Sequence, residues 1–323
     1  KKEVISRIKL NNIDCDFSPG IINTTINSKD TNYLYDEVNN LKKKYQYNKI
    51  QKLSSSELST IIDTDLYDGG CLDFGAGHLN PLKFVQGLGT AAKKNTVQIF
   101  EKCCVEKIDY GKKNTISVSN GYTVVSDYLI IACNGYLGNL EPNISSRVMP
   151  INNFILTTEV LGNNLLNSFL NNNYAVADNK FVPNYFRPSP DNRLIFGGGE
   201  NYTYRFPKDI KTIVRKKMLK VYPQLKNTRI DFAWGGTLAV TRNRLPYFAK
   251  IQPNVFSASG YSGHGVALSV LAGRIIAELI QGDSKRFNFM NNIPIKPFPG
   301  NSNFQWPLLV LGMLWYSLRD RFK

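Results

Sequence analysis

The sequence predicts a mixed α/β (α+β) fold, and three segments carry that prediction. Residues 127–135 form a short apolar run that ends in a polar turn, which is typical of a central strand in a parallel sheet. Residues 254–281 have the pattern of a strand, a glycine-rich turn and a long amphipathic helix. Between residues 153 and 234, short strands separated by turns indicate an antiparallel sheet. We therefore expect a parallel-sheet unit interleaved with an antiparallel one.

The first hundred residues are predicted to contain helices joined by short strands and turns. Helical spacing of apolar residues predicts a helix over 3–10, and a second helix that Ser28 caps and that continues through Lys44. Asn80 and Pro81 predict a further helix, to about Lys94, because asparagine caps a helix and proline suits its first position. The other expected elements are a turn at Pro19-Gly20, a short helix from the serines at 54–56, a turn at 68–70 and strands at 71–74 and 97–100.

The later elements follow the same rules. Asn120-Gly121 predicts a hairpin, because this pair favours the tight turn that joins twisted strands. Gly197-Gly198-Gly199 closes a strand and predicts a bulge. Gly282 ends the long helix that begins near Val266. The remaining expected elements are strands at 104–108, 115–118, 122–125, 154–160, 185–187, 194–196 and 230–234, and a helix at 208–222.

Composition excludes several classes of protein. The chain has 323 residues, 42% hydrophobic and 20% charged, which excludes a disordered tail, a collagen-like fibre and a coiled-coil rod. The formal net charge is +15, but the basic runs are short and scattered and no nucleic-acid module accompanies them. We therefore expect no nucleic-acid partner, although a cationic surface would steer an anionic substrate.

The cysteines, histidines and apolar runs predict the cellular compartment and whether the protein binds a metal or inserts into a membrane. Five cysteines without a disulfide spacing pattern predict a reduced, cytoplasmic protein. His78 and His264 are the only histidines, so we expect no metal site. No apolar stretch reaches the ~20 residues needed to span a bilayer, so we expect no stable membrane insertion. The longest stretch, 306–316, is interpreted as a buried C-terminal helix, with a helix on a membrane surface as the alternative.

The strongest local signal is the glycine-rich turn 259–265. Glycines allow the backbone to approach a ligand closely, and the free N–H groups at the start of the next helix favour negative charge. This favours a phosphate or the electron-rich edge of a flavin, with a tight strand–helix corner as the alternative. The pattern Gly87-Leu88-Gly89-Thr90-Ala91-Ala92 is not counted as a nucleotide motif, because it lies inside a predicted helix.

Seven blocks along the chain resemble one protein family. The block at 254–280 resembles the C-terminal flavin-binding signature of the D-amino-acid oxidase-like superfamily of FAD-dependent oxidoreductases, and more closely its gamma-glutamylputrescine oxidase-like branch. The resemblance covers nearly the whole chain. The other six blocks are Ile13-Asp14-Cys15-Asp16-Phe17 with Pro19-Gly20, Gly75-Ala76-Gly77-His78-Leu79-Asn80-Pro81, Asn134-Gly135-Tyr136-Leu137-Gly138, Asp191-Asn192-Arg193-Leu194 with 197–199, Pro223-Gln224-Leu225-Lys226 and Tyr316-Ser317-Leu318-Arg319-Asp320-Arg321.

The resemblance implies a Rossmann-like FAD/NAD(P)-binding domain interleaved with an antiparallel-sheet substrate domain. The family opens with a strand–GxGxxG–helix unit that binds the FAD pyrophosphate, and the sequence has no counterpart of it. We therefore predict that the chain is a fragment whose cofactor domain is incomplete at its N-terminus, with a degenerate protein without flavin as the alternative. The predicted FAD-binding domain is 63–150 and 235–285, the substrate domain is 11–62 and 151–234, and the tail is 286–323.

The resemblance places FAD between the two domains. The strand that ends at 132–135 would pass near the pyrophosphate, the backbone of Val105 would flank the adenine, and the turn 260–266 would meet the isoalloxazine. His264 is interpreted as a residue that positions the backbone, with an acid/base role as the alternative. The expected cofactor-binding residues are Val105, Ala132, Asn134, Gly135, Trp234, Gly260, Tyr261, Ser262, Gly263, His264, Gly265 and Val266.

The resemblance also implies that the antiparallel sheet faces the substrate. Tyr185 and Trp234 would wall a slot, and Arg187 would hold a carboxylate in a bidentate pair, with a strand-surface salt bridge as its alternative. His78 would touch flavin or substrate, or else cap and pack. The residues expected to be catalytic are His264, Arg187 and Tyr185.

The implied reaction is oxidation of the C–N bond of an amine or amino acid, such as a gamma-glutamylputrescine-like compound. A hydride would pass to flavin N5, the imine would be hydrolysed, and O2 would be the acceptor. Positioning and electrostatics would supply most of the rate. The alternatives are oxidation of an N-methyl amino acid or glycine, and a non-catalytic basic binding protein.

Overall fold

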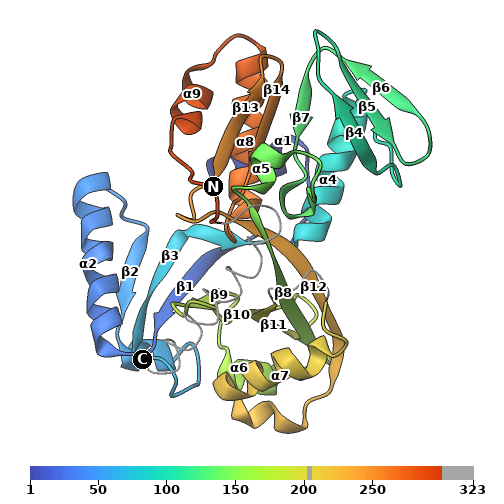
Figure 1. Cartoon of the computed structure of the whole chain (residues 1–323). Helices are drawn as coiled ribbons and strands as arrows, with labels where there is room; N and C mark the ends of the chain where they lie inside the picture. Colours follow the sequence, from blue (N-terminus) through green and yellow to red (C-terminus); the bar gives the residue numbers. More distant parts are fainter. Residues whose placement is uncertain (202–205, 300–323) are drawn as a thin grey trace.

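The computed structural model describes residues 1–201 and 206–299, and the strands in these residues form three sheets (Figure 1). The largest sheet contains β1 (Ser18–Thr25), β2 (Ile50–Leu53), β3 (Gly69–His78), β8 (Met149–Thr158), β9 (Ala175–Asp178), β10 (Tyr185–Pro188), β11 (Leu194–Asn201) and β12 (Ile230–Val240). The second contains β7 (Leu129–Ile131), β13 (Tyr247–Gln252) and β14 (Val255–Ser259), and the third β4 (Val105–Asp109), β5 (Asn114–Val118) and β6 (Thr123–Ser126).

Helices connect and cover these sheets. The α-helices are α1 (Lys2–Leu10), α2 (Ser28–Tyr45), α3 (Ser55–Ser59), α4 (Pro81–Lys94), α5 (Pro142–Ser145), α6 (Asn163–Phe169), α7 (Ile210–Val221), α8 (Gly265–Ile280) and α9 (Lys285–Asn291). Two 3-10 helices are η1 (Asn134–Tyr136) and η2 (Pro223–Asn227). Within the described residues, no helix is both long and apolar enough to cross a membrane.

The sheets confirm the predicted mixed α/β architecture. The large sheet has the strand order β12-β8-β11-β10-β9-β1-β3-β2, in which β1 and β9 are parallel and the other pairs are antiparallel. The second sheet has the order β13-β14-β7, and β14 and β7 are parallel. Figure 1 shows this sheet with α8 above the large sheet, and the β4-β5-β6 meander to one side.

Local side-chain chemistry explains where several helices begin. Asn80 caps α4 as predicted, because its Oδ1 accepts the N–H groups of Leu82 and Lys83 at 3.1 and 3.2 Å. Ser54 and Glu57 form the capping box of α3. The cap of α2 differs from the prediction by one residue: Asn27 and not Ser28 accepts a backbone N–H, that of Asp30, at 2.9 Å.

The main core lies between one face of the large sheet and the helices below it in Figure 1, including α6 and α7. On α7, Val214, Met218 and Val221 are buried at helical spacing. The sheet contributes fully buried side chains at alternate positions of its strands, namely Ile22, Phe154, Leu156, Leu194 and Phe196. Because side chains alternate along a strand, their neighbours in sequence point to the opposite face. That second face carries the residues predicted to meet the substrate.

Two predicted turns are wrong, because glycines there serve close strand pairing. Gly69 and Gly70 begin β3, where they pair with Thr25 and Thr24. A Cβ on Gly70 would lie 2.7 Å from the carbonyl oxygen of Asn23, so only glycine permits this approach. Pro19-Gly20 likewise lies inside β1, where the register shifts. The hairpin at Asn120-Gly121 and the bulge after Gly197 are confirmed.

The strand predicted at 97–100 is not formed, and the apolar strand at 129–131 lies at one edge of the sheet that the described residues form. Val97, Ile99 and Phe100 are exposed and without strand pairing. In the described sheet β7 is an edge strand, and β14, with all five residues buried, is the centre. A short apolar sequence marks a strand, but its neighbours in the sheet are decided by tertiary packing.

Sheet membership crosses the predicted domain boundaries. The strand β3 and residues 235–240 of β12, which fall in the stretches predicted for the cofactor domain, belong to the large sheet. The division into two domains stays a prediction. The C-terminal helix predicted at 306–316, and the block at 316–321, lie outside the described residues.

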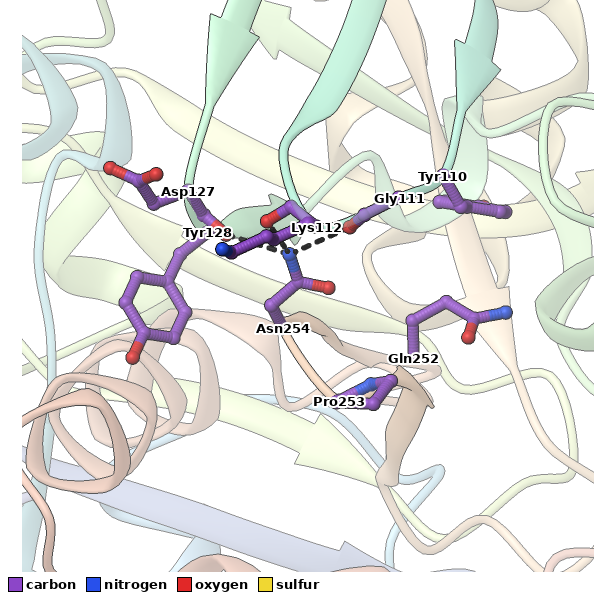
Figure 2. Close-up of a pocket in the computed structure, with 8 residues that line it drawn as sticks. All are labelled: Tyr110, Gly111, Lys112, Asp127, Tyr128, Gln252, Pro253 and Asn254. Carbon is purple, nitrogen blue, oxygen red and sulfur yellow. Dashed lines mark hydrogen bonds between the residues drawn. The ribbon is translucent and has the colours of Figure 1, made fainter.

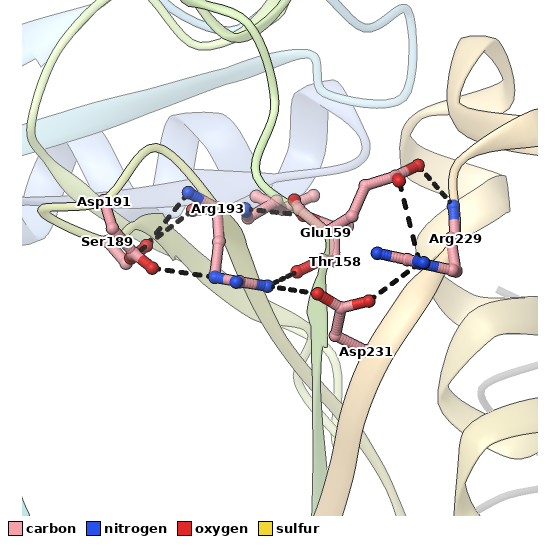
Figure 3. Close-up of polar contacts among 8 residues, drawn as sticks. Thr158, Glu159, Ser189, Asp191, Arg193, Arg229 and Asp231 are labelled. Carbon is pink, nitrogen blue, oxygen red and sulfur yellow. Dashed lines mark hydrogen bonds and ion pairs between the residues drawn. The ribbon is translucent and has the colours of Figure 1, made fainter.

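An ion-pair network anchors the β10–β11 hairpin to its neighbours (Figure 3). Arg193 binds Asp231 through Nη1 at 2.6 Å and Asp191 through Nε at 2.7 Å, and Nη1 also donates to the carbonyl of Thr158 at 2.8 Å. Arg229 holds the second oxygen of Asp231 at 2.9 Å. These contacts tie the turn of the hairpin to β8 and β12, and so fix the strand on which two predicted substrate residues lie.

Candidate active site

The glycine-rich turn follows β14 and starts α8, as predicted. Gly260, Ser262 and Gly263 have positive φ angles of 69°, 51° and 92°. The Gly260 N–H donates to Asn134 Oδ1 at 3.1 Å, and the Ser262 N–H donates to the carbonyl of Ala239 at 2.9 Å. The turn is therefore bonded both to the segment that follows β7 and to β12 of the large sheet.

The start of α8 leaves backbone donors available. His264 occupies the N-cap position but makes no side-chain cap hydrogen bond. The first N–H groups of a helix have no acceptor within it, and they mark the positive end of the helix dipole. Gly263, His264 and Val266 are exposed around these groups. This end of the helix is suited to an electron-rich partner.

Tyr261 is placed differently from the other residues of the turn. Its ring is buried in the core formed with α8 and α9, and its hydroxyl donates to the carbonyl of Ala258 at 2.9 Å. Burial raises its pKa to about 12, so it stays neutral. Only its backbone is available at the predicted cofactor site.

The parallel pairing of β7 and β14 brings the two predicted cofactor segments together. Ile131 lies opposite Ser257, so residues 132–135 and 260–266 leave the sheet at the same edge. A Cβ on Gly135 would lie 2.7 Å from the carbonyl oxygen of Leu238, which shows how closely this segment approaches β12. Val105 begins β4 in the meander. Burial raises the pKa of Cys133, and the charge of Cys104, the residue before Val105, raises it further.

Three of the predicted substrate residues, Tyr185, Arg187 and Trp234, share the face of the large sheet opposite the main core, which we call the open face. Strand register orders its residues into rows, each of which crosses neighbouring strands. The first row is Arg187, Ile195, Thr157 and Phe232; the second is Tyr185, Gly197, Ile155 and Trp234; the third is Glu200, Asn153 and Gly236. Tyr185 and Trp234 are therefore three strand spacings apart, about 14 Å. Trp234 is 44% exposed, whereas the Tyr185 ring extends across β11 toward Asn153 on β8.

Arg187 presents a cation to this face. Its guanidinium donates to the carbonyls of Pro188 at 3.1 Å and Leu79 at 3.4 Å. Burial lowers its pKa, and the charge of Asp16 partly opposes that shift. Among the described residues no carboxylate lies within 4.0 Å of the Arg187 guanidinium. The strand-surface salt bridge, which was the alternative role expected for Arg187, is therefore not formed with these residues.

The ring of His78 is engaged in a hydrogen bond within the protein. Its Nε2 lies 2.8 Å from the carbonyl of Asn173, and its Nδ1 is buried without a partner among the described residues. Burial lowers its pKa, and the charge of Arg187 lowers it further, so the ring is neutral at pH 7. Of the two roles expected for His78, this arrangement favours packing beside Arg187.

Two residues of the open face carry no local signal in the sequence. Asn153 Oδ1 accepts a hydrogen bond from the hydroxyl of Tyr185, although the two residues are 32 positions apart in the chain. Gly236 lies beside Asn153 on β12, and in the part of the chain that the structure describes no atom lies within 4 Å of the place where its Cβ would be. The register of an antiparallel sheet relates them, and that register cannot be obtained from either segment alone.

A second, open pocket of about 600 Å³ lies elsewhere (Figure 2). Asn254 stands at its centre, and its amide donates to the carbonyls of Asp127, Gly111 and Lys112 at 2.8, 3.2 and 3.3 Å. Its residues precede β7 and β14, whereas the predicted cofactor segments follow these strands. The pocket is therefore at the opposite edge of the sheet, and none of the predicted site residues lines it.

Comparison with known proteins decides what this arrangement is. The family described as FAD dependent oxidoreductase (DAO) matches residues 2–279. The chain belongs to this family. It is an enzyme, its cofactor is FAD, and the family resemblance expected from the sequence is confirmed. The alternative of a non-catalytic basic binding protein is thereby wrong, and the prediction that the chain is a fragment stays a prediction.

Individual relatives sharpen the comparison. The chain is 37% identical over 316 residues to gamma-glutamylputrescine oxidoreductase of Escherichia coli (strain K12), covering 98% of this chain and 74% of that protein. It is 35% identical over 322 residues to the probable oxidoreductase OrdL of Rhizobium meliloti (strain 1021), covering 100% of this chain and 75% of that protein. The structure of glycine oxidase from Geobacillus kaustophilus has a TM-score of 0.76 at 18% identity, covering 91% of this chain and 80% of that chain. The last similarity concerns the fold.

Proposed function

We propose that this oxidoreductase oxidises the C–N bond of an amine that also carries a carboxylate, a gamma-glutamylputrescine-like compound. The observation that carries the proposal is Arg187, a partly buried cation on the open face without a carboxylate partner among the described residues. A desolvated guanidinium binds a carboxylate strongly, because the paired charges are hydrogen-bonded and shielded from water. The relative from Escherichia coli supports this substrate class.

The turn after β14 would hold the flavin ring, and the segment after β7 would lie along the cofactor. Support comes from the free N–H groups at the start of α8 and from Gly263, whose Cβ position has no atom of the described residues within 4 Å. When bound, FAD supplies an acceptor for two electrons and a proton from the substrate. Asn134 would hold the turn in place through the Gly260 N–H, and the helix dipole would favour added negative charge.

The remaining chemistry belongs to the substrate and the open face. The amine loses two electrons and two protons to give an imine, which water hydrolyses to a carbonyl compound and ammonia. Dioxygen as the acceptor would be reduced to hydrogen peroxide. Arg187 would anchor the carboxylate, while Tyr185 and Trp234 would bound the slot and exclude water from the reacting bond. A cytoplasmic location remains a prediction from cysteine content.

An amine panel with peroxide detection tests the proposal. We expect turnover of gamma-glutamylputrescine with a kcat/KM at least tenfold above that of putrescine, which lacks the carboxylate. Arg187→Gln should remove this preference by raising KM for the carboxylate-bearing substrate about 10- to 100-fold, the range for a charged hydrogen-bonded pair. Arg215→Gln, on the far side of the sheet in α7, is the matched control and should leave both substrates unchanged.

The same panel separates the alternative substrates. Turnover of sarcosine or glycine without turnover of gamma-glutamylputrescine would reverse the substrate assignment. Equal kcat/KM for putrescine and gamma-glutamylputrescine in the parent protein would remove Arg187 as the anchor.

A further inference from the structure

Tyr185 lies across the sheet in an unusual way, because glycine occupies the position beside it. Tyr185 on β10 is paired with Gly197 on β11, and a Cβ on Gly197 would overlap the tyrosine ring. The ring therefore extends over β11 toward β8. There its hydroxyl meets the side chain of Asn153. The tyrosine hydroxyl therefore lies near the middle of the open face.

The direction of the hydrogen bonds follows from what each atom can do. The Nδ2 group of Asn153 donates to the carbonyl oxygen of Gly199 at 3.3 Å. A carbonyl oxygen only accepts, so the NH2 group must face Gly199 and Oδ1 must face Tyr185. An amide oxygen also only accepts, so the tyrosine hydroxyl must donate to it. Its single proton is then committed, and its remaining lone pairs can only accept.

We infer that Asn153 is a positioning residue that makes Tyr185 a hydrogen-bond acceptor for the substrate amine. The inference rests on the proposed function, and it gives the bound substrate a direction. The carboxylate faces Arg187 in the first row, and the amine N–H groups face Tyr185 in the next row, about 7 Å along the strand.

Two further observations agree with this orientation. Burial raises the pKa of Tyr185, and the charge of Glu200 in the third row raises it further, so the phenol stays neutral. A neutral phenol whose proton is committed offers only lone pairs, which suit the N–H groups of an amine or ammonium and not a carboxylate. Beside Asn153, no atom of the described residues lies within 4 Å of the Cβ position of Gly236, which leaves room for the amine end among them.

Binding of two matched ligands to the FAD-loaded full chain, measured by calorimetry, tests the inference. Pentylamine carries only the amine and pentanoate only the carboxylate, at equal chain length. We expect Tyr185→Phe and Asn153→Ala each to raise the dissociation constant of pentylamine roughly three- to tenfold, the value of one hydrogen bond. Neither change should weaken pentanoate binding. The double variant should be no weaker than either single variant, because both remove the same interaction.

Asn153→Asp separates positioning from a general structural role. The aspartate keeps an acceptor for the Tyr185 hydroxyl but loses the donor to Gly199, so it should retain pentylamine affinity where Asn153→Ala does not. Additive effects of Tyr185→Phe and Asn153→Ala, weaker pentanoate binding in Tyr185→Phe, or equal losses in Asn153→Asp and Asn153→Ala would overturn the inference.

Arg187→Gln distinguishes failure of this inference from failure of the proposed function. If Arg187→Gln loses pentanoate binding while Tyr185→Phe leaves pentylamine binding unchanged, only the inference about Tyr185 and Asn153 is overturned. If Arg187→Gln leaves pentanoate binding unchanged, the proposal that Arg187 binds the substrate carboxylate is overturned. Absence of binding of both ligands to the parent protein would overturn both.

Discussion

Gly197 and Gly236 lie on the same face of the large sheet, and alanine at each should have opposite consequences. A Cβ at Gly197 overlaps the Tyr185 ring, whereas a Cβ at Gly236 meets no atom of residues 1–201 and 206–299 within 4 Å. Neither glycine has a positive φ angle, so alanine fits the backbone at both places. Alanine restricts the unfolded chain and adds about 0.4–1 kcal/mol of stability wherever the backbone accepts it. Both variants gain that contribution.

The difference between the two variants therefore measures what Tyr185 loses. Gly197→Ala must displace the ring and break its hydrogen bond to Asn153, which costs about 0.5–1.5 kcal/mol, and part of the ring's packing is lost as well. We expect Gly197→Ala to be about 1–2 kcal/mol less stable than Gly236→Ala, with the packing loss included. Urea unfolding of both variants, followed by circular dichroism, gives the two free energies under identical conditions.

The same pair of variants has a functional readout. Gly197→Ala should weaken pentylamine binding as much as Asn153→Ala does, because both dislodge the tyrosine hydroxyl. Equal stability of the two glycine variants, together with unchanged pentylamine affinity in Gly197→Ala, would refute the placement of Tyr185 over Gly197.

Three further predictions concern other parts of the molecule. The hydrogen bond from Arg193 lowers the pKa of Asp231, so this carboxylate stabilises the fold above pH ~4 and loses that effect as the pH falls through its lower folded-state pKa. In Asp231→Asn the urea midpoint should therefore fall less steeply between pH ~4 and lower pH than in the parent protein. Equal pH dependence of the two midpoints would contradict this. Tyr222→Phe should be neutral or stabilising in urea unfolding, because the buried hydroxyl has no partner among the described residues, and a loss above about 1 kcal/mol would reveal a missed hydrogen bond. Ile130→Lys, at a 45% exposed position on the edge strand β7 of the described sheet, should reduce light scattering on heating, whereas Ile213→Lys on α7 should not.

Local chemistry in the sequence was sufficient for many elements. The cap at Asn80, the short helix from the serines at 54–56, the hairpin at Asn120-Gly121 and the strand–turn–helix around 260–266 were all predicted. Each depends on residues within a few positions of one another, and their conformational preferences act without help from the rest of the chain. Short motifs in the sequence also carried the resemblance to FAD-dependent oxidoreductases, and the family match confirms it.

Tertiary pairing decided what the motifs could not. Gly70 was predicted in a turn, but the carbonyl of Asn23 on a neighbouring strand requires it inside β3. The apolar run at 129–131 identified a strand but not its place at the edge of the described sheet. Neighbours across a sheet come from segments far apart in the chain, so the alternation within one strand cannot reveal them.

The sequence by itself therefore determined the fold class, the cofactor family and the residue types of the candidate site. The family resemblance carried by that sequence pointed to Tyr185, Arg187 and Trp234. Only the tertiary structure placed them in rows on one face, laid Tyr185 over Gly197 and brought it to Asn153. The physical reason is that strand register and the packing of one face of a sheet set hydrogen-bond direction, and both are properties of several strands at once.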